Sequence, residues 1–150
     1  MRAVIQRVSE ASVSADGQCV GSIERGLLVL LGVTHEDTEQ DADWLASKIA
    51  QLRIFSDADG KMNLAIDQIE GSVLLISQFT LFAATKKGNR PSFVDAAAPE
   101  QANQLYLYFG HRLEQLLSKP IQRGVFAADM KVSLLNDGPV TLIIDTKNKE

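Results

Sequence analysis

Two strongly apolar, strand-like stretches of this chain are interrupted by polar residues, and these interruptions constrain the fold most. The run 73–76 contains only valine, leucine and isoleucine and is followed at once by Ser77 and Gln78. Further along, the runs 132–135 and 140–144 are separated by the segment 136–139, Asn-Asp-Gly-Pro. Buried polar groups need hydrogen bonds or a cavity, and proline removes a donor from a β-ladder. Both interruptions are therefore expected to be sites.

The composition predicts one globular domain that spans residues 1–150. With 45% hydrophobic residues, a chain of this length buries roughly 70% of its unfolded surface in a single core. The longest apolar run, 27–31, is far shorter than the roughly 18 residues of a membrane span, and residues 1–10 lack a signal-peptide pattern. The single cysteine, Cys19, cannot form an internal disulfide, which favours a reducing compartment. We therefore expect a cytoplasmic protein with no membrane partner.

Hydrophobic periodicity predicts several strands and two helices. An Asp-Gly hairpin turn is expected at 15–17. The first helix is expected to begin after Thr38, with Asp41 completing a capping box, and the second to begin at Pro99. Gly110 inside the second helix costs about 1 kcal/mol relative to alanine, so close packing is expected there. Strands are expected at 4–13, 18–23, 27–33, 73–76, 132–135 and 140–144.

These elements predict an α+β fold class: a single domain with a mostly antiparallel sheet and two main helices. The tail, residues 147–150, is expected to fray. A turn is expected at 57–61, between short apolar segments.

Familiar metal-binding and catalytic patterns are missing. The segment 57–61 looks like the start of a calcium loop, but positions six and twelve of that loop would be Met62 and Gln68. The two histidines, His35 and His111, lie far apart and match no zinc motif. The chain has neither GxxxxGK nor GxSxG. We therefore expect no metal, no cofactor and no conventional serine triad.

Residues Ser77 to Ala83 and Asn136 to Thr141 match a pair of motifs usually written SQFTLxA and NxGPVT. Through these motifs the whole chain resembles the D-aminoacyl-tRNA deacylases. The resemblance implies a hydrolase that cleaves the ester between a D-amino acid and the terminal adenosine of tRNA, as proofreading in translation. It also implies a sheet curled toward a barrel, and a homodimer with active sites at the subunit interface.

The first motif indicates catalysis by the main chain. After a buried strand, the N–H groups of Gln78, Phe79 and Thr80 can point into a cleft and stabilise the oxyanion of ester hydrolysis, with Ser77 beside them. Thr80 is the one candidate nucleophile, but no His, Lys or Asp is obviously paired with it as a base. A role in orienting the substrate therefore stays open. The resemblance implies that the ribose hydroxyl beside the ester assists the attack.

The second motif suggests selection between enantiomers. Only about 5 to 6% of X-Pro bonds are cis, so the residues alone favour a trans Gly138-Pro139 bond. The resemblance implies instead a cis bond that enters the partner subunit's active site and rejects L-aminoacyl substrates through backbone contacts. Because glycine has no side chain to reject, glycyl-tRNA is then expected to be cleaved too. Asn136 and Thr141 belong to the motif, and Arg7 is its implied support, with a surface ion pair as the alternative.

The charge balance argues against a protein that coats nucleic acid. The net charge is -4 and the pI is about 5.2, whereas broad phosphate neutralisation needs a basic surface. Lys86, Lys87 and Arg90 nevertheless follow the first motif closely and are a candidate contact for an RNA end, with a solvated loop as the alternative. Two other functions stay open: editing of tRNA mischarged with glycine or a noncognate L-amino acid, and a catalytically silent module that binds an RNA end or small ligand.

Overall fold

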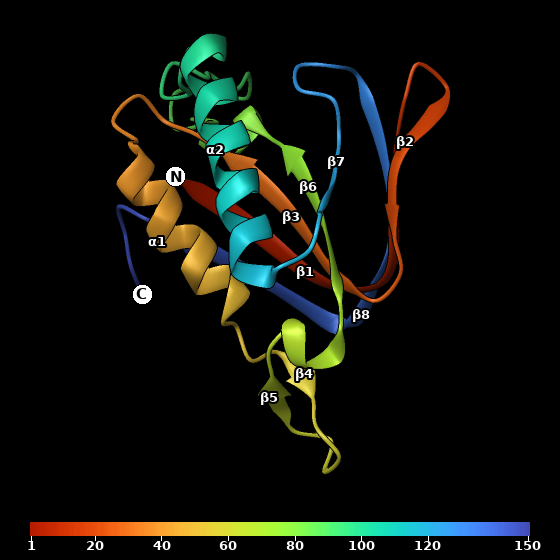
Figure 1. Ribbon diagram of the computed structural model, residues 1–150. Coiled ribbons are helices and arrows are strands. Elements are labelled where there is room, and N and C mark those ends of the chain that lie inside the picture. Colours follow the sequence, from red (N-terminus) through yellow and green to blue (C-terminus); the bar gives the residue numbers. More distant parts are fainter.

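The computed structural model describes residues 1–150 and confirms the predicted α+β class (Figure 1). Two helices pack on one curled, barrel-like sheet, and a separate two-stranded hairpin projects at one end. The strands are β1 Arg2–Ala15, β2 Gln18–Ile23, β3 Gly26–Gly32, β4 Phe55–Ser56, β5 Met62–Leu64, β6 Ser72–Ser77, β7 Gln122–Arg123 and β8 Met130–Asp145. The helices are α1 Glu39–Ala50 and α2 Pro99–Leu117, with 3-10 turns η1 Asp67–Ile69 and η2 Phe79–Phe82.

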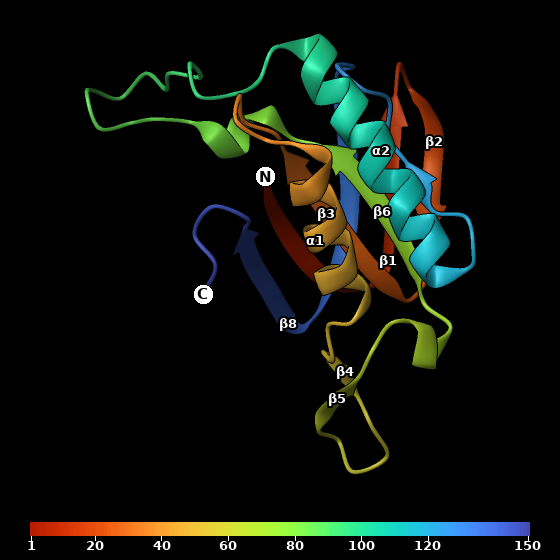
Figure 2. The ribbon, with the colours of Figure 1, turned by 60° about the vertical axis from the view of Figure 1, so that its left-hand side comes forward.

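The sheet is mixed, and its antiparallel part contains the longest pairings. β1 runs antiparallel to β2, β3 and β8, which confirms the prediction of a mostly antiparallel sheet. The pairs β3–β6 and β6–β7 are parallel. Parallel neighbours need a long crossover connection, and α1 and α2 each lie in one of the two crossovers. Both helices lie on the same face of the sheet, as Figure 2 shows.

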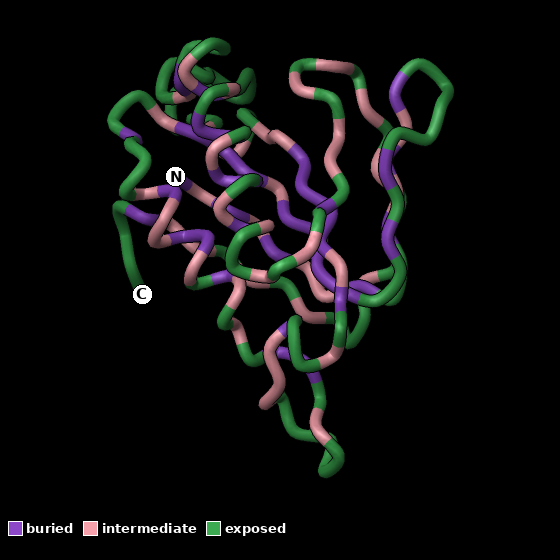
Figure 3. The backbone as a smooth tube through the Cα atoms, in the orientation of Figure 1, coloured by how far each residue is buried: buried purple, intermediate pink, exposed green.

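The core has two parts because β3 and β6 are buried on both faces. Alternate residues of the two strands face the helices, including Leu27, Val29 and Leu75. The residues between them, such as Leu28 and Leu74, face the inside of the curled sheet. Figure 3 shows the buried residues gathered along these central strands and the inner sides of the helices. Burial on both faces explains why the sequences of β3 and β6 are almost uninterrupted apolar runs.

The start of α1 is capped as predicted and also holds the tail of the chain. The Thr38 N–H donates to the Asp41 carboxylate at 2.9 Å, as part of a capping box. Burial opposes ionisation of Asp41, but hydrogen bonds from Thr38 and Lys147 outweigh it and lower the pKa of Asp41 to about 2. Lys147 lies 3.1 Å from Asp41, and the Lys149 ammonium lies 4.4 Å from the Trp44 ring centre. The expectation of a frayed tail is therefore wrong for these two lysines.

Helix α2 begins at Pro99 and packs closely at Gly110, as predicted. A Cβ atom on Gly110 would lie 2.8 Å from the guanidinium of Arg123, which is paired with Glu114. Glycine has low helix propensity, but at this position it leaves the space that the Arg123 side chain occupies. None of the helices combines the length and the apolar character needed to cross a bilayer.

The pairing of β3 with β6 requires glycine at position 26. A Cβ atom there would lie 1.8 Å from the Ser72 carbonyl oxygen, which is backbone and cannot rotate away. We expect Gly26→Ala to lower the free energy of unfolding by at least about 2 kcal/mol, because the strands must separate. Urea unfolding measures this, with Glu24→Ala at an exposed neighbouring position as the control. Equal stability of Gly26→Ala and the parent protein would contradict the close approach.

Candidate active site

The first motif lies where β6 ends and the chain turns into η2. Ser77 is the last residue of β6 and pairs with Leu31 of β3. The next N–H, that of Gln78, donates to the Leu31 carbonyl at 2.8 Å. The far end of the turn is held by Arg2, which donates to the Leu81 carbonyl at 2.7 Å. The peptide groups between these two anchors are therefore fixed at both ends.

Two backbone donors in this turn have no acceptor in the chain. Phe79 and Thr80 open a 3-10 turn, where the first N–H groups lack partners within the turn. No turn, loop or cap hydrogen bond starts from either group. The Gln78 N–H, in contrast, already donates to the Leu31 carbonyl, so it is not a free donor in this chain. The two free donors can bind an oxygen atom of a ligand.

The Thr80 hydroxyl has no base beside it. Its oxygen accepts a hydrogen bond from the side-chain amide of Gln78. An amide N–H donates and cannot take a proton from the hydroxyl. Activation of Thr80 as a nucleophile would need a base in hydrogen-bond contact, and this chain supplies none there.

A mostly apolar cavity of about 600 Å³ lies beside the first motif. It is lined by the ends of β3 and β6, the start of α2 and the segment that leads into β8, with His35, Ser77, Gln78 and Tyr106 as polar members. The Tyr106 hydroxyl donates to the Leu75 carbonyl at 3.1 Å. Burial raises the pKa of Tyr106 to about 12, so this hydroxyl stays protonated at neutral pH. A small organic group with a few polar atoms suits such a cavity.

The second motif forms a bulge in β8. Its flanking residues pair with Gln6 and Val8 of β1, so residues 137–140 stand opposite Arg7 alone. The Gly138-Pro139 bond at its centre is cis. Residues 137–139 are exposed. The bulge therefore presents the backbone around Gly138 and Pro139 to the surroundings of the chain.

Side chains on both sides hold the bulge in place. Arg7 donates to the Asp137 carbonyl at 3.0 Å and to the Ile54 carbonyl at 2.7 Å. The Arg7 side chain is only 11% exposed, and it also lies 3.5 Å from the Asp137 carboxylate. Asn136 donates to the Thr141 hydroxyl at 3.0 Å across the base of the bulge. Arg7 thus bonds the backbone of the motif and also forms an ion pair, with the Asp137 carboxylate of the same motif.

One chain does not bring its two motifs together. The bulge lies opposite Arg7, which pairs with Leu27, and Leu27 pairs with Val73 near the start of β6. The first motif begins at the other end of β6, with Ser77. From the spacing of residues along a strand and of neighbouring strands, the two motifs lie roughly 20 Å apart.

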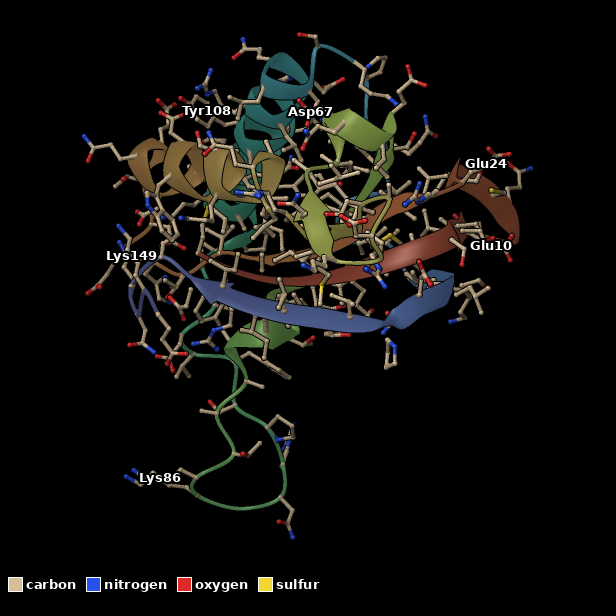
Figure 4. The ribbon with its side chains drawn as sticks, turned by 90° about the horizontal axis from the view of Figure 1, so that it is seen from below. Glu10, Glu24, Asp67, Lys86, Tyr108 and Lys149 are labelled. Carbon is tan, nitrogen blue, oxygen red and sulfur yellow. The ribbon has the colours of Figure 1, made fainter.

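The candidate RNA contacts lie on a loop that projects from the body of the protein (Figures 2 and 4). Ala84 and Ser92 pair across its base, with N–H to carbonyl distances of 2.8 and 2.9 Å. We call residues 84–92 the basic loop. Lys86, Lys87 and Arg90 are exposed on it, and none of them forms an ion pair within the chain. Their charges are available to a partner.

Asp57 closes a turn, as expected for the segment 57–61. Its carboxylate accepts the N–H groups of Asp59 at 2.9 Å and Lys61 at 3.0 Å. The bond from Lys61 is the main cause that lowers the pKa of Asp57. No group of three or more His, Cys, Asp or Glu side chains gathers to hold a metal ion.

Three residues near the first motif were not predicted from the sequence. Arg2 holds η2, His35 lines the cavity, and Phe93 packs edge to face on Phe79 with ring centres 5.1 Å apart. Arg2 and His35 come from distant parts of the chain and stand in no recognisable spacing with the motif. The sequence offered a signal for Phe93 alone, because it is the one aromatic residue in the segment 83–98.

Comparisons with known proteins extend over nearly the whole chain. A family described as D-Tyr-tRNA(Tyr) deacylase matches residues 4–145. A D-aminoacyl-tRNA deacylase of Opitutus terrae is 59% identical over 100% of both chains. One of Geotalea uraniireducens is 60% identical over 100% of this chain and 97% of its own.

Two solved structures share the fold. One, titled c-Myc DNA Unwinding Element Binding Protein, has a TM-score of 0.90 and 39% identity over 97% of this chain and 98% of its own. The other is titled Structural Analysis of a probable eukaryotic D-amino acid tRNA deacylase. It has a TM-score of 0.81 at 15% identity, over 95% of this chain and 97% of its own, and so supports the fold alone. With the family match over residues 4–145, these relatives establish that the chain belongs to the D-Tyr-tRNA(Tyr) deacylase family.

Proposed function

We propose that this protein hydrolyses the ester between a D-amino acid and the 3′-terminal adenosine of tRNA, and that it does so in the cytosol. The relatives of highest identity described above are named for this reaction. The observation that carries the proposal is the pair of unpaired N–H groups of Phe79 and Thr80 beside an apolar cavity. This arrangement supplies a site for a developing negative charge without a metal or an ionisable nucleophile.

The two donors stabilise the oxyanion of the hydrolysis. Water attacks the ester carbonyl carbon, and the carbonyl oxygen becomes negative between the N–H groups of Phe79 and Thr80. Collapse of the tetrahedral intermediate breaks the bond to the ribose oxygen, which takes up a proton. Because Thr80 has no base, we assign its hydroxyl to substrate orientation. The neighbouring ribose hydroxyl then assists the attacking water.

The cavity beside Phe79 accommodates the terminal adenine. Its volume of about 600 Å³ lies in the range of small-ligand sites, which combine apolar walls with a few polar groups. His35, Ser77 and Gln78 supply polar atoms among its apolar walls. Binding the base there leaves the ester near the free N–H groups of η2.

A second copy of the chain completes the site. The bulge of β8 and the first motif lie roughly 20 Å apart within one chain, so a bulge that contacts substrate must come from a partner subunit. Strand β8 pairs only with β1, and its second edge is free. Leu135 and Ile143 on this strand are 57% and 71% exposed. A long free edge with exposed apolar residues favours burial against another copy, and twofold symmetry gives two equivalent sites.

The backbone of Gly138 and Pro139 selects against the L enantiomer. A site that accepts many side chains must recognise what all substrates share: the amino group, the α-carbon and the carbonyl. A rigid backbone held by Arg7 and Asn136 excludes the position that an L side chain would occupy. Such a filter tests for an L side chain and places no demand on a D side chain.

The first test of this function compares three substrates. We expect the protein to deacylate D-alanyl-tRNA and glycyl-tRNA and to spare L-alanyl-tRNA. A hydrophobic pocket alone could not achieve this, because one methyl group is worth only about 1 to 3 kcal/mol of discrimination. Comparable rates on D-alanyl and L-alanyl tRNA would contradict the filter and favour editing of L-amino acids. Inactivity on all three esters would favour a silent binding module.

Arg7→Ala tests the support of the filter. Loss of two charge-assisted bonds to backbone carbonyls should let the bulge move. We expect the ratio of D-alanyl to L-alanyl deacylation to fall at least about tenfold, which corresponds to about 1.4 kcal/mol. Glu10→Ala, an exposed residue of the same strand, is the matched control. Unaltered selectivity in a dimeric Arg7→Ala protein would remove Arg7 from this role.

The basic loop is tested by the salt dependence of tRNA affinity. If Lys86, Lys87 and Arg90 neutralise three phosphates of a single-stranded end, the logarithm of the tRNA affinity should fall with the logarithm of the salt concentration at a slope of about -2. The double variant Lys86→Ala with Lys87→Ala should reduce the slope to about -0.7. Lys61→Ala, exposed in the turn between β4 and β5, should leave it unchanged. An unchanged slope in the double variant would show that the tRNA is held elsewhere.

A further inference from the structure

The aromatic pair Phe79–Phe93 joins the basic loop to the turn that carries the free donors. The two rings meet edge to face, with centres 5.1 Å apart and planes at 71°. Aromatic pairs prefer this geometry. Phe79 belongs to η2, whereas Phe93 directly follows the bridge between Ala84 and Ser92.

The backbone on both sides of Phe93 is anchored. On one side, Ser92 and Ala84 exchange two hydrogen bonds. On the other side, the Val94 carbonyl lies 2.7 Å from the His35 ring nitrogen, and the Thr34 hydroxyl donates to the next carbonyl, that of Asp95, at 2.6 Å. The backbone that carries the Phe93 ring is therefore held in place.

Phe79, in contrast, has few constraints of its own. Its side chain is 57% exposed, and η2 is a short 3-10 turn with poor hydrogen-bond geometry. The anchors at Gln78 and Leu81 fix the ends of the turn. Between them, the contact with Phe93 is the one aromatic interaction that holds the residue whose N–H is free.

We propose that Phe93 is a positioning residue, which fixes the Phe79 N–H for the oxyanion by packing against the Phe79 ring. This inference rests on the proposed function. Its consequence is kinetic: loss of the Phe93 ring lowers the rate of the chemical step. Because the ring also lines the cavity assigned to the adenine, its loss weakens substrate binding as well, and the positioning role is read from kcat. Removing an oxyanion donor entirely costs about 10² to 10³ in kcat, so a displaced donor should cost about tenfold.

The experiment measures kcat and KM for Phe93→Ala, Phe93→Tyr and the parent protein. The substrates are D-alanyl-tRNA and 3′-O-D-alanyl adenosine, which lacks phosphates. Phe93→Ala should lower kcat about tenfold on both substrates by the same factor, in addition to any rise in KM from the altered cavity wall. Phe93→Tyr keeps the ring and should restore kcat. Val94→Ala, at a neighbouring position that is 74% exposed, should match the parent.

An unchanged kcat in Phe93→Ala would overturn the inference. A raised KM at constant kcat would also overturn it, because the ring would then act on substrate binding alone. So would a kcat of Phe93→Tyr that stays as low as that of Phe93→Ala. A merely structural role would lower the thermal midpoint of Phe93→Ala and leave kcat of the folded protein at the parent value. A parent protein inactive on both esters would overturn the proposed function, and this inference with it. An active parent with an unaffected Phe93→Ala overturns the inference alone.

Discussion

The parallel pairing of β3 with β6 is the constraint on which the other features of this protein depend. The two backbones approach so closely at Gly26 and Ser72 that no side chain fits between them. This pairing places the end of β6 beside Leu31, whose carbonyl then receives the Gln78 N–H and starts the turn η2. It also requires a crossover, which brings α1 onto the helical face of the sheet. Core packing and site geometry thus have one origin.

The proposed function assigns two chemical tasks to two segments of one sheet. Stabilisation of charge is assigned to the backbone at η2, and discrimination between enantiomers to the backbone of the bulge near Gly138. Both use main-chain groups, whose positions depend on their anchors: Arg2 for the turn and Arg7 for the bulge. Because the two segments lie far apart in one chain, each site of the proposed dimer would depend on correct assembly. The proposal therefore links specificity to quaternary structure.

The sequence predicted what depends on local patterns. The strands at 4–13, 18–23, 27–33 and 73–76, the capping box at Thr38, the Asp-Gly turn at 15–17 and the close packing at Gly110 all follow from periodicity or from the needs of single residues, and the structure confirms them. The two strands expected at 132–135 and 140–144 are parts of one strand, β8. The sequence did not predict that β6 pairs in parallel with both β3 and β7, because the hydrophobic pattern of a buried strand is the same for parallel and antiparallel neighbours. The sequence also did not predict the hydrogen bond between the His35 ring and the Val94 carbonyl or the ion pair of Lys147 with Asp41, because both join segments that are distant in the sequence. The motifs indicated the candidate site, whereas the contacts that support it depend on the fold.

The central claim is that a main-chain N–H of Phe79 stabilises the oxyanion, and comparison of Phe79→Pro with Phe79→Ala tests it most directly. Both variants lose the ring, but only proline lacks the N–H. Proline suits the first position of the turn, and the preceding residue, Gln78, has φ -145° and ψ 78°, outside the helical region that proline disfavours. The account predicts that kcat for D-alanyl-tRNA is about 10² to 10³ lower in Phe79→Pro than in Phe79→Ala. Equal kcat values in two folded, dimeric variants would contradict it.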